Sequence, residues 1–236
     1  MSKNVDLCLV VIYNILWGID NNPISNNKLI YEREGVLLSQ ANVTKEWSNP
    51  TPAGLVALAV ACFCFFALLS GKVTSAALPL LGCWLLGGFV VQIVVALVDL
   101  KGGNTTGGNT FLFFSAFFML VGGLEMMLKF YAANNGIVLD AHIDGWAWLV
   151  LTIVVYMWTP AFFKTPLVLT LIVLALDVAL PFITLMDLGI LPKTFSVIPA
   201  WALLIAGIFG IYLSAAIIVN TAFGRQVYPS PGPIIK

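Results

Sequence analysis

The chain carries very little charge for its length. Of its 236 residues only 9% are charged and 60% are hydrophobic, whereas roughly a quarter of a typical soluble domain is charged. The eleven basic and eleven acidic residues balance, so net charge favours neither nucleic acid nor an acidic surface as a partner. This composition excludes an ordinary soluble domain and is typical of a membrane protein with several spans.

Histidine and cysteine are also scarce. The single histidine, His142, lies between Asp140 and Asp144 with no second histidine to complete a metal site, and we expect it in a solvated loop. The four cysteines fall mostly within apolar runs, and Cys62 and Cys64 lie on different faces of a helix. Free buried thiols are therefore expected, and neither a metal site nor a cofactor is predicted.

The sequence motifs of common enzyme classes are missing. There is no Gly-x-Ser-x-Gly, no His-Glu-x-x-His, no phosphate-binding loop and no pair of carboxylates at a fixed helical spacing. An enzyme is therefore not expected. The candidates that remain are polar residues inside apolar runs, because such residues are costly in a bilayer.

Six apolar runs follow a polar leader, and each is close to the ~20 residues that span a ~30 Å hydrocarbon core. They are expected at residues 51–70, 76–98, 111–130, 145–163, 167–186 and 198–220. The sequence thus predicts an all-α, multi-pass protein of the cell membrane. Its parts are a leader over 1–48, a six-span domain over 49–220 and a short cytoplasmic tail over 221–236. Within the leader, the apolar run at 7–17 is too short to span and is expected to form an interfacial helix.

An even number of spans places both termini on one side of the membrane. On that side lie Lys3, Lys28, Arg33, Lys45, Lys101, Lys164, Arg225 and Lys236, against Lys72, Lys129 and Lys193 on the other. Because basic loops remain in the cytoplasm, both termini are predicted to be cytoplasmic.

The first span opens with Asn49-Pro50-Thr51-Pro52-Ala53-Gly54. Asn49 can cap a helix, and the prolines suit positions whose N–H groups would be unpaired. The free N–H groups and the positive dipole end of such a helix can also hold a carboxylate. A capped helix start without a ligand is the alternative.

Further polar residues lie within the later spans. Gln92 is in the second span, and Asp177 in the fifth precedes Pro181 by four residues, so the proline removes a backbone hydrogen bond to the carbonyl of residue 177. Asp177 either exchanges protons or senses substrate, or it is a neutral carboxyl tied to the backbone. Glu125 and Lys129 have the spacing of an ordinary pair one helical turn apart.

Small residues recur at every fourth position of the last span, at Ala202, Ala206, Gly210 and Ser214. Such a ridge lets helices approach closely in lipid, either within a subunit or between subunits. The stretch Gly103-Asn104-Thr105-x-Gly107 predicts a tight turn that caps the third span.

Four of these motifs, in order, resemble those of the acetate uptake transporter, or succinate–acetate permease, family. They are Asn49-Pro50-x-Pro52-x-Gly54-Leu55, Gly87-Gly88-x-x-x-Gln92, Gly103-Asn104-Thr105-x-Gly107 and Phe223-Gly224-Arg225, the last with Ile211-Tyr212-Leu213 upstream. The resemblance covers about residues 49–229 and leaves out the leader.

This resemblance implies a six-helix subunit assembled into a homohexamer. Each subunit would hold its own pathway for acetate and similar monocarboxylates, and in some members for succinate. Transport would be either proton-coupled or channel-like, depending on the member. It also implies a central hydrophobic constriction of phenylalanine, tyrosine and leucine, whose positions here hold Leu58, Phe114 and Leu176. Gly210 stands opposite, where bacterial members have alanine. Only Leu176 keeps the family residue, so the choice of substrate is open.

From the resemblance we expect a proton-linked transporter or channel for small carboxylates, with protons, the lipid bilayer and further copies of the chain as partners. The expected substrate-binding residues are Asn49, Pro50, Thr51, Pro52, Gly54, Gln92, Asn104 and Thr105. One alternative is an ammonium or ammonia exporter, for which Phe114 and Asp177 are the candidate cation-binding residues. Another is a membrane sensor or assembly subunit that transports nothing.

Overall fold

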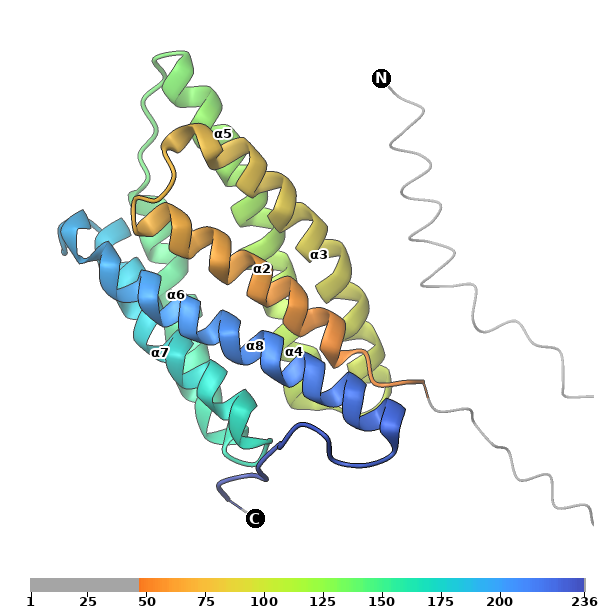
Figure 1. The fold of residues 1–236 in the computed structure, drawn as a ribbon. Helices are drawn as coiled ribbons and strands as arrows, with labels where there is room; N and C mark the ends of the chain where they lie inside the picture. The colour runs from red at the N-terminus through yellow and green to blue at the C-terminus, as the bar shows by residue number, and fades with distance from the viewer. Residues whose placement is uncertain (1–46, 236) are drawn as a thin grey trace, which may run out of the picture. The chain divides into compact units, whose positions relative to one another are not determined.

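The computed structural model describes residues 47–235, so the predicted interfacial helix at 7–17 lies outside the described residues. The described chain is all-α (Figure 1). Its helices are α2 (Thr51–Leu69), α3 (Leu78–Lys101), α4 (Thr105–Phe113), α5 (Gly122–Asn134), α6 (His142–Phe162), α7 (Leu167–Asp187) and α8 (Val197–Phe223). A π-helical segment, η2 (Phe114–Val121), joins α4 to α5. Short 3-10 turns, η1 (Ser75–Ala77) and η3 (Lys193–Ser196), lead into α3 and α8.

Six helical stretches are long and apolar enough to cross a bilayer, which confirms the predicted number of spans. They are Thr51–Leu69, Ser75–Lys101, Thr105–Asn134, His142–Phe162, Leu167–Asp187 and Lys193–Phe223. The third stretch begins six residues before the predicted 111–130. The polar residues 105–110 are helical because the Asn104 side chain caps them, accepting a hydrogen bond from Gly107 N at 3.0 Å.

The third span is not one continuous α-helix, because a π-helical segment interrupts it directly before Gly122 and Gly123. In η2 the backbone takes the π form, whose i→i+5 hydrogen bonds widen the helix. Phe114 and Phe118 are both buried within this segment, and their rings meet edge to face with centroids 5.9 Å apart. The segment therefore places a layer of aromatic rings in the interior of the bundle.

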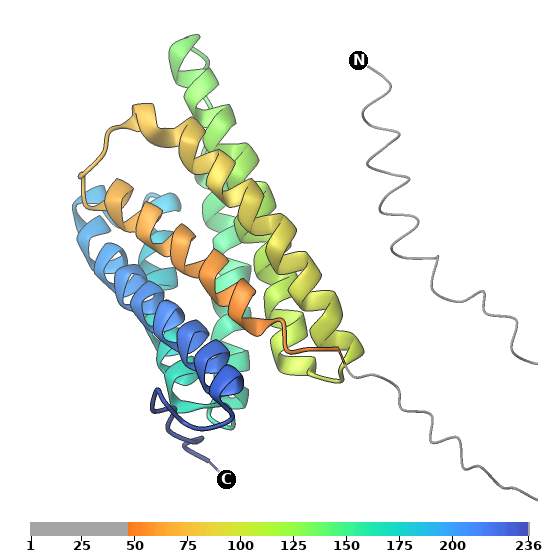
Figure 2. The ribbon, with the colours of Figure 1, turned by 45° about the vertical axis from the view of Figure 1, so that its right-hand side comes forward.

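The small-residue ridge of α8 packs against α2 within the same subunit, and Figures 1 and 2 show the two helices side by side. A Cβ added at Gly210 would lie 3.3 Å from the Leu55 carbonyl oxygen. One turn later, the Ser214 hydroxyl donates to the Pro52 carbonyl oxygen at 3.0 Å. The ridge thus fixes how α8 lies along the first span.

Helix α3 lies equally close to α5 (Figure 2). A Cβ added at Gly82 would lie 2.7 Å from the Gly123 carbonyl oxygen, and one at Gly123 would lie 3.0 Å from the Gly82 carbonyl oxygen. Glycine is required here because the two backbones touch. Between these helix pairs lies the core, whose largest fully buried side chains include Leu55, Leu85, Met119 and Ile172.

The C-terminal tail folds back across one end of the bundle (Figure 1). Helix α8 ends at Gly224, which has φ of +61°. From there the chain reaches the turn between α6 and α7, where Leu167 N donates to the Pro231 carbonyl oxygen at 3.1 Å and Ile235 N to the Phe163 carbonyl oxygen at 2.9 Å. The tail therefore covers the end at which α2 begins.

Candidate functional site

A cavity of about 260 Å³ lies at the end of the bundle where α2, α4 and α7 begin, and we call it the first cavity. Toward the helix ends its walls are polar, with Asn49, Thr51, Asp99, Asn104, Thr106, Thr110, Thr165 and Ser230. Farther along the helices its walls are apolar, with Leu55, Leu58, Phe111, Phe113, Phe114, Trp158, Ile172, Leu176 and Leu213. Gln92 from α3 also lines it.

This cavity brings together most of the residues that the sequence singled out. Asn49, Thr51, Gln92 and Asn104 line it, as do the three predicted constriction residues Leu58, Phe114 and Leu176. These three come from α2, η2 and α7, and all are buried. We refer to Leu58, Phe114 and Leu176 as the girdle.

Other predicted site residues lie outside the lining: Pro50, Pro52, Gly54, Thr105, Gly210 and Asp177. Gly54 supports the wall indirectly, because a Cβ there would lie only 2.5 Å from Cε1 of the Phe111 ring. Gly210 contacts the α2 backbone, so any influence on the girdle passes through the spacing of α2 and α8. Their roles as substrate or constriction residues remain predictions.

Two backbone N–H groups at the start of α2 are paired within the chain. Thr51 N donates to Asn49 Oδ1 at 3.0 Å, and Ala53 N donates to the Pro50 carbonyl oxygen at 3.1 Å. Pro52 has no N–H to offer. A carboxylate at this helix end would therefore find its donors in side chains, in the Asn49 amide and the Thr51 hydroxyl that line the cavity.

Asn104 makes two side-chain hydrogen bonds near its own loop, which leaves one N–H of its amide without a partner in the part of the chain that the structure describes. Its Oδ1 caps α4, while its Nδ2 donates to Asp99 Oδ2 at 3.1 Å, and Gly103 turns the chain with φ of +80°. The predicted tight turn is thus confirmed. Asp99 was not among the predicted site residues, although it lines the first cavity. Asp99 is only 6% exposed, and it is the one charged residue among the described residues that line the first cavity.

Gln92 presents an unpaired acceptor. Gln92 is 1% exposed, and its Nε2 donates to the Gly54 carbonyl oxygen at 3.3 Å. This contact fixes the orientation of the amide, because the reversed amide would place two oxygens against each other. The Oε1 atom has no hydrogen-bond partner. Leaving a buried acceptor unpaired costs about 1–3 kcal/mol.

Asp177 lies at the contact between α6 and α7. Its Oδ2 lies 2.8 Å from the Thr159 hydroxyl, which is also 2.9 Å from the Val155 carbonyl oxygen. A hydroxyl has one proton to donate, so Thr159 shares it between these two acceptors. The predicted roles of Asp177 in proton exchange or substrate sensing would therefore act from between two helices.

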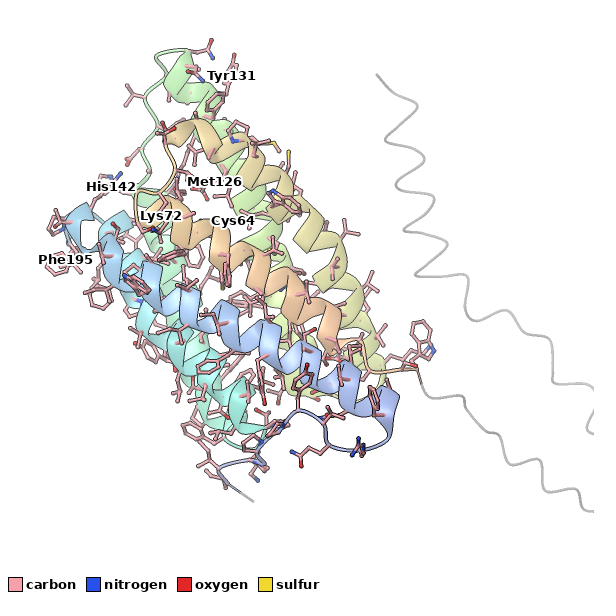
Figure 3. All side chains as sticks on the ribbon, in the orientation of Figure 1. Cys64, Lys72, Met126, Tyr131, His142 and Phe195 are labelled. Atoms are coloured by element: carbon pink, nitrogen blue, oxygen red, sulfur yellow. The ribbon has the colours of Figure 1, made fainter. Side chains whose placement is uncertain are left out.

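A second cavity, of about 370 Å³, lies at the opposite end and is lined by Glu125, Lys129, Asp187 and Lys193 together with apolar residues that include Phe65, Phe118 and Trp148. Lys129 contacts Glu125, as their spacing predicted, and also lies 2.9 Å from Asp144. Figure 3 labels Met126, another lining residue, near this end. His142, also labelled there, is exposed as expected, although it begins α6 and is not in a loop.

Only a thin apolar layer separates the two cavities. Phe114 borders the first and Phe118 borders the second, and their rings are in contact. Phe118 also meets Phe65 and Trp148, with centroids 5.3 and 6.0 Å apart. The arrangement provides a chamber with some polar residues in its wall at each end, and an aromatic and aliphatic barrier between the two chambers.

Comparison with known proteins relates this arrangement to one solved structure. No protein-family model and no curated protein matches the sequence. Among the solved structures that match is the bacterial acetate channel SatP, with a TM-score of 0.68 and 21% sequence identity, covering 78% of this chain and 99% of the channel. This match confirms, for the fold, the resemblance carried by the four motifs. The chain therefore has the fold of the bacterial acetate channel SatP.

Proposed function

We propose that the chain is a membrane transporter or channel for acetate and similar small carboxylates. The observation that carries the proposal is the first cavity, which gathers the polar motif residues at one end and closes on the girdle of Leu58, Phe114 and Leu176. The solved structure with the same fold is an acetate channel, which adds support and favours transport over catalysis.

The girdle sets the main energetic problem for such a substrate. An acid whose pKa resembles that of Glu, about 4.3, costs about 3.7 kcal/mol to protonate at pH 7, which is ~2.7 pH units at ~1.36 kcal/mol each. Carrying a carboxylate to the centre of a bilayer costs about 2.5–3.5 kcal/mol on insertion scales and more in simulations. Because the two costs are similar, the groups that line the route decide which form crosses.

The proposal includes several finer features. Transport is linked to protons, the subunits form a homohexamer, and both termini face the cytoplasm. The barrier between the cavities supports a substrate that sheds its charge, and the excess of basic residues on the side of the termini supports the orientation. Succinate is included as a bulkier substrate, because Leu58 and Phe114 change the girdle.

The test is uptake of labelled acetate into proteoliposomes, with and without an imposed inward proton gradient, against empty liposomes. Protein-dependent accumulation that the gradient stimulates is the expected result, whereas flux that only equilibrates would identify a channel. Leu176→Arg should reduce uptake to the level of empty liposomes, because it places a charge in the girdle. Leu176→Met, which keeps the side-chain volume, should retain uptake. Wild-type protein without acetate flux would overturn the proposal.

A second candidate is an ammonium or ammonia exporter, and the chemistry of the first cavity favours it at two points. Gln92 Oε1 and the Asp99 carboxylate both accept hydrogen bonds, and the rings of Phe113 and Trp158 line the same space. Labelled methylammonium in the same proteoliposomes distinguishes the two. Flux of neither substrate would favour the sensor or assembly subunit.

A further inference from the structure

A groove of about 330 Å³ runs between the third span and α6, and we call it the seam groove. Helix α6 packs mainly against α7, whereas η2 and α5 pack mainly against α3, so the seam between the two groups is left partly open. Each side gives one stripe of residues to the groove. The third span contributes Phe113, Phe117, Val121 and Glu125, and α6 contributes Asp144, Ala147, Trp148, Val150, Leu151 and Val154.

Most of the seam groove is apolar and faces outward from the bundle. Phe117 is 54% exposed and Val150 is 60% exposed, and both lie within membrane spans. The stripe from Phe113 to Glu125 rises roughly 15–18 Å along the third span, which is about half of a ~30 Å hydrocarbon core. The groove therefore has the length of one acyl chain in a single leaflet.

The charged end of the seam groove is acidic. Glu125 and Asp144 are the two charged residues among the described residues that line it, and 21% and 18% of their side chains are exposed. Lys129 contacts both carboxylates but lines the second cavity and not the groove. Asp187 and Lys193, which line the second cavity as well, are of opposite sign. Two carboxylates thus share one ammonium group, and one negative charge is left at the end of the groove.

This acidic end lies where lipid headgroups begin. Asp144 is in the first turn of α6, at the start of the fourth span. Nearby Trp146 is 61% exposed, and tryptophan is enriched at the surface of the membrane. Pockets that bind anionic headgroups are basic, so an acidic end disfavours these lipids. A headgroup with a positive charge is favoured instead.

Hydrogen bonding narrows the choice of headgroup further. A primary ammonium group donates charge-assisted hydrogen bonds to carboxylates, whereas the quaternary ammonium group of choline has no N–H to donate. We propose that the seam groove binds phosphatidylethanolamine, with the ammonium group at Glu125 and Asp144 and one acyl chain along the apolar stripes. Such a lipid would bridge α6 and η2, the segment that carries Phe114 of the girdle. The inference goes beyond the proposed function, because it does not depend on what the protein transports.

The experiment is native mass spectrometry of the full chain, released from detergent micelles with equal amounts of three dioleoyl lipids. These are phosphatidylethanolamine, phosphatidylcholine and phosphatidylglycerol. Because their acyl chains are identical, the ratio of bound lipids reports headgroup preference alone. We expect the wild type to retain phosphatidylethanolamine about tenfold over either competitor, as a charge-assisted hydrogen bond would provide.

Asp144→Asn tests the acidic end. It removes the charge that is left over while Lys129 keeps its contact with Glu125, so the tenfold preference should disappear. The matched control is Asp140→Asn. It removes a carboxylate that lies outside the groove and contacts His142, and it should keep the preference.

Ala147→Phe tests the apolar part by filling the groove with a ring while leaving both carboxylates in place. It should lower the retained phosphatidylethanolamine about tenfold, to the level of the competitors. The control is Val94→Phe, which places a ring at a 54% exposed position on α3, outside the groove. This variant should bind lipid as the wild type does.

Several outcomes would overturn the inference. Equal retention of the three lipids would show that the groove does not recognise a headgroup. A preference that survives in both Asp144→Asn and Ala147→Phe would place the lipid elsewhere on the protein. If Ala147→Phe breaks up an oligomer and leaves the lipid ratio unchanged, another copy of the chain occupies the groove. If one variant fails to fold, the other variant and its control decide. Acetate flux enters none of these measurements, so failure here and failure of the proposed function are separate results.

Discussion

Tyr156 repairs a break that Pro181 makes in α7. The proline lacks the N–H that would bond to the carbonyl oxygen of Asp177, one turn earlier. The Tyr156 hydroxyl on α6 donates to this oxygen at 2.8 Å. A backbone acceptor in the middle of a span is thus satisfied from a neighbouring helix, as backbone groups at membrane depth must be.

Replacing Tyr156 with phenylalanine should lower the free energy of unfolding by about 0.5–1.5 kcal/mol, the usual worth of one such hydrogen bond. In a Pro181→Ala background the effect should be smaller, because alanine restores an N–H to residue 181. Thermal or denaturant unfolding in detergent, arranged as a double-mutant cycle, measures the difference. Equal losses in both backgrounds would show that the hydroxyl does not replace the missing backbone bond.

At the residue scale, the sequence predicted positions better than partners. The resemblance named Leu58, Phe114 and Leu176 as a constriction and Gln92 as a substrate-binding residue. All four line one cavity, and their roles stay predictions. Spacing could not show that the Gln92 amide uses its N–H on Gly54, nor which polar atoms would stay unpaired. Those facts depend on contacts between residues far apart in the chain, and spacing along the sequence does not reveal such contacts.

The C-terminal tail is held to the bundle by the Asn220 side chain. Its Oδ1 accepts from Val227 N at 2.7 Å and from Tyr228 N at 2.9 Å, while its Nδ2 donates to the Tyr228 carbonyl oxygen at 2.9 Å. The Tyr212 hydroxyl adds a bond to the Pro229 carbonyl oxygen at 2.6 Å. Ser230, next along, lines the first cavity, so this segment forms part of its wall.

Asn220→Ala should free the backbone around Tyr228, since both its N–H and its carbonyl lose their partner. We expect trypsin to cleave after Arg225, two residues before Val227, about tenfold faster, which corresponds to a loss of ~1.4 kcal/mol in the free energy that keeps this segment bound to the bundle. Mass spectrometry of the detergent-solubilised protein over time measures the rate. As a control, Asn109→Ala removes an asparagine that bonds only within α4, to Thr105, and should leave the rate unchanged. If both variants are cut at the wild-type rate, the segment is held by other contacts.

At the element scale, hydropathy predicted all six spans but not the form of the third. Apolar runs report burial in lipid, so they locate a span without distinguishing α from π geometry. Residues 114–121 contain neither proline nor glycine, the usual signals of an irregular helix. The π segment is maintained by tertiary packing, in which Phe114 and Phe118 share the layer between the two cavities.

Over the whole six-span unit, the two cavities differ in character, and under the proposed function a substrate would move from one to the other. The first holds Asp99 and the Gln92 acceptor, whereas the second holds Glu125, Lys129, Asp187 and Lys193. A neutral acid that passes the rings of the barrier would reach Lys193, which could pair with its anion once it ionises, whereas Lys129 already pairs with Glu125 and Asp144. The girdle would then separate a protonated form on one side from an ionised form on the other.

The orientation of this route is open to direct measurement through introduced cysteines at opposite ends of the bundle. Val138 lies in the loop between α5 and α6 and is 94% exposed, and Gly232 lies exposed in the tail with open space around an added Cβ. If both termini are cytoplasmic, a membrane-impermeant maleimide should label Val138→Cys in intact cells and Gly232→Cys only after permeabilisation. The parent chain, with its own cysteines, gives the background. The reverse pattern would invert the orientation and place the first cavity outside the cell. In the six-span topology, three spans lie between this loop and the tail, so the two cysteines are on opposite sides of the membrane. Labelling of both cysteines from one side would therefore contradict this topology.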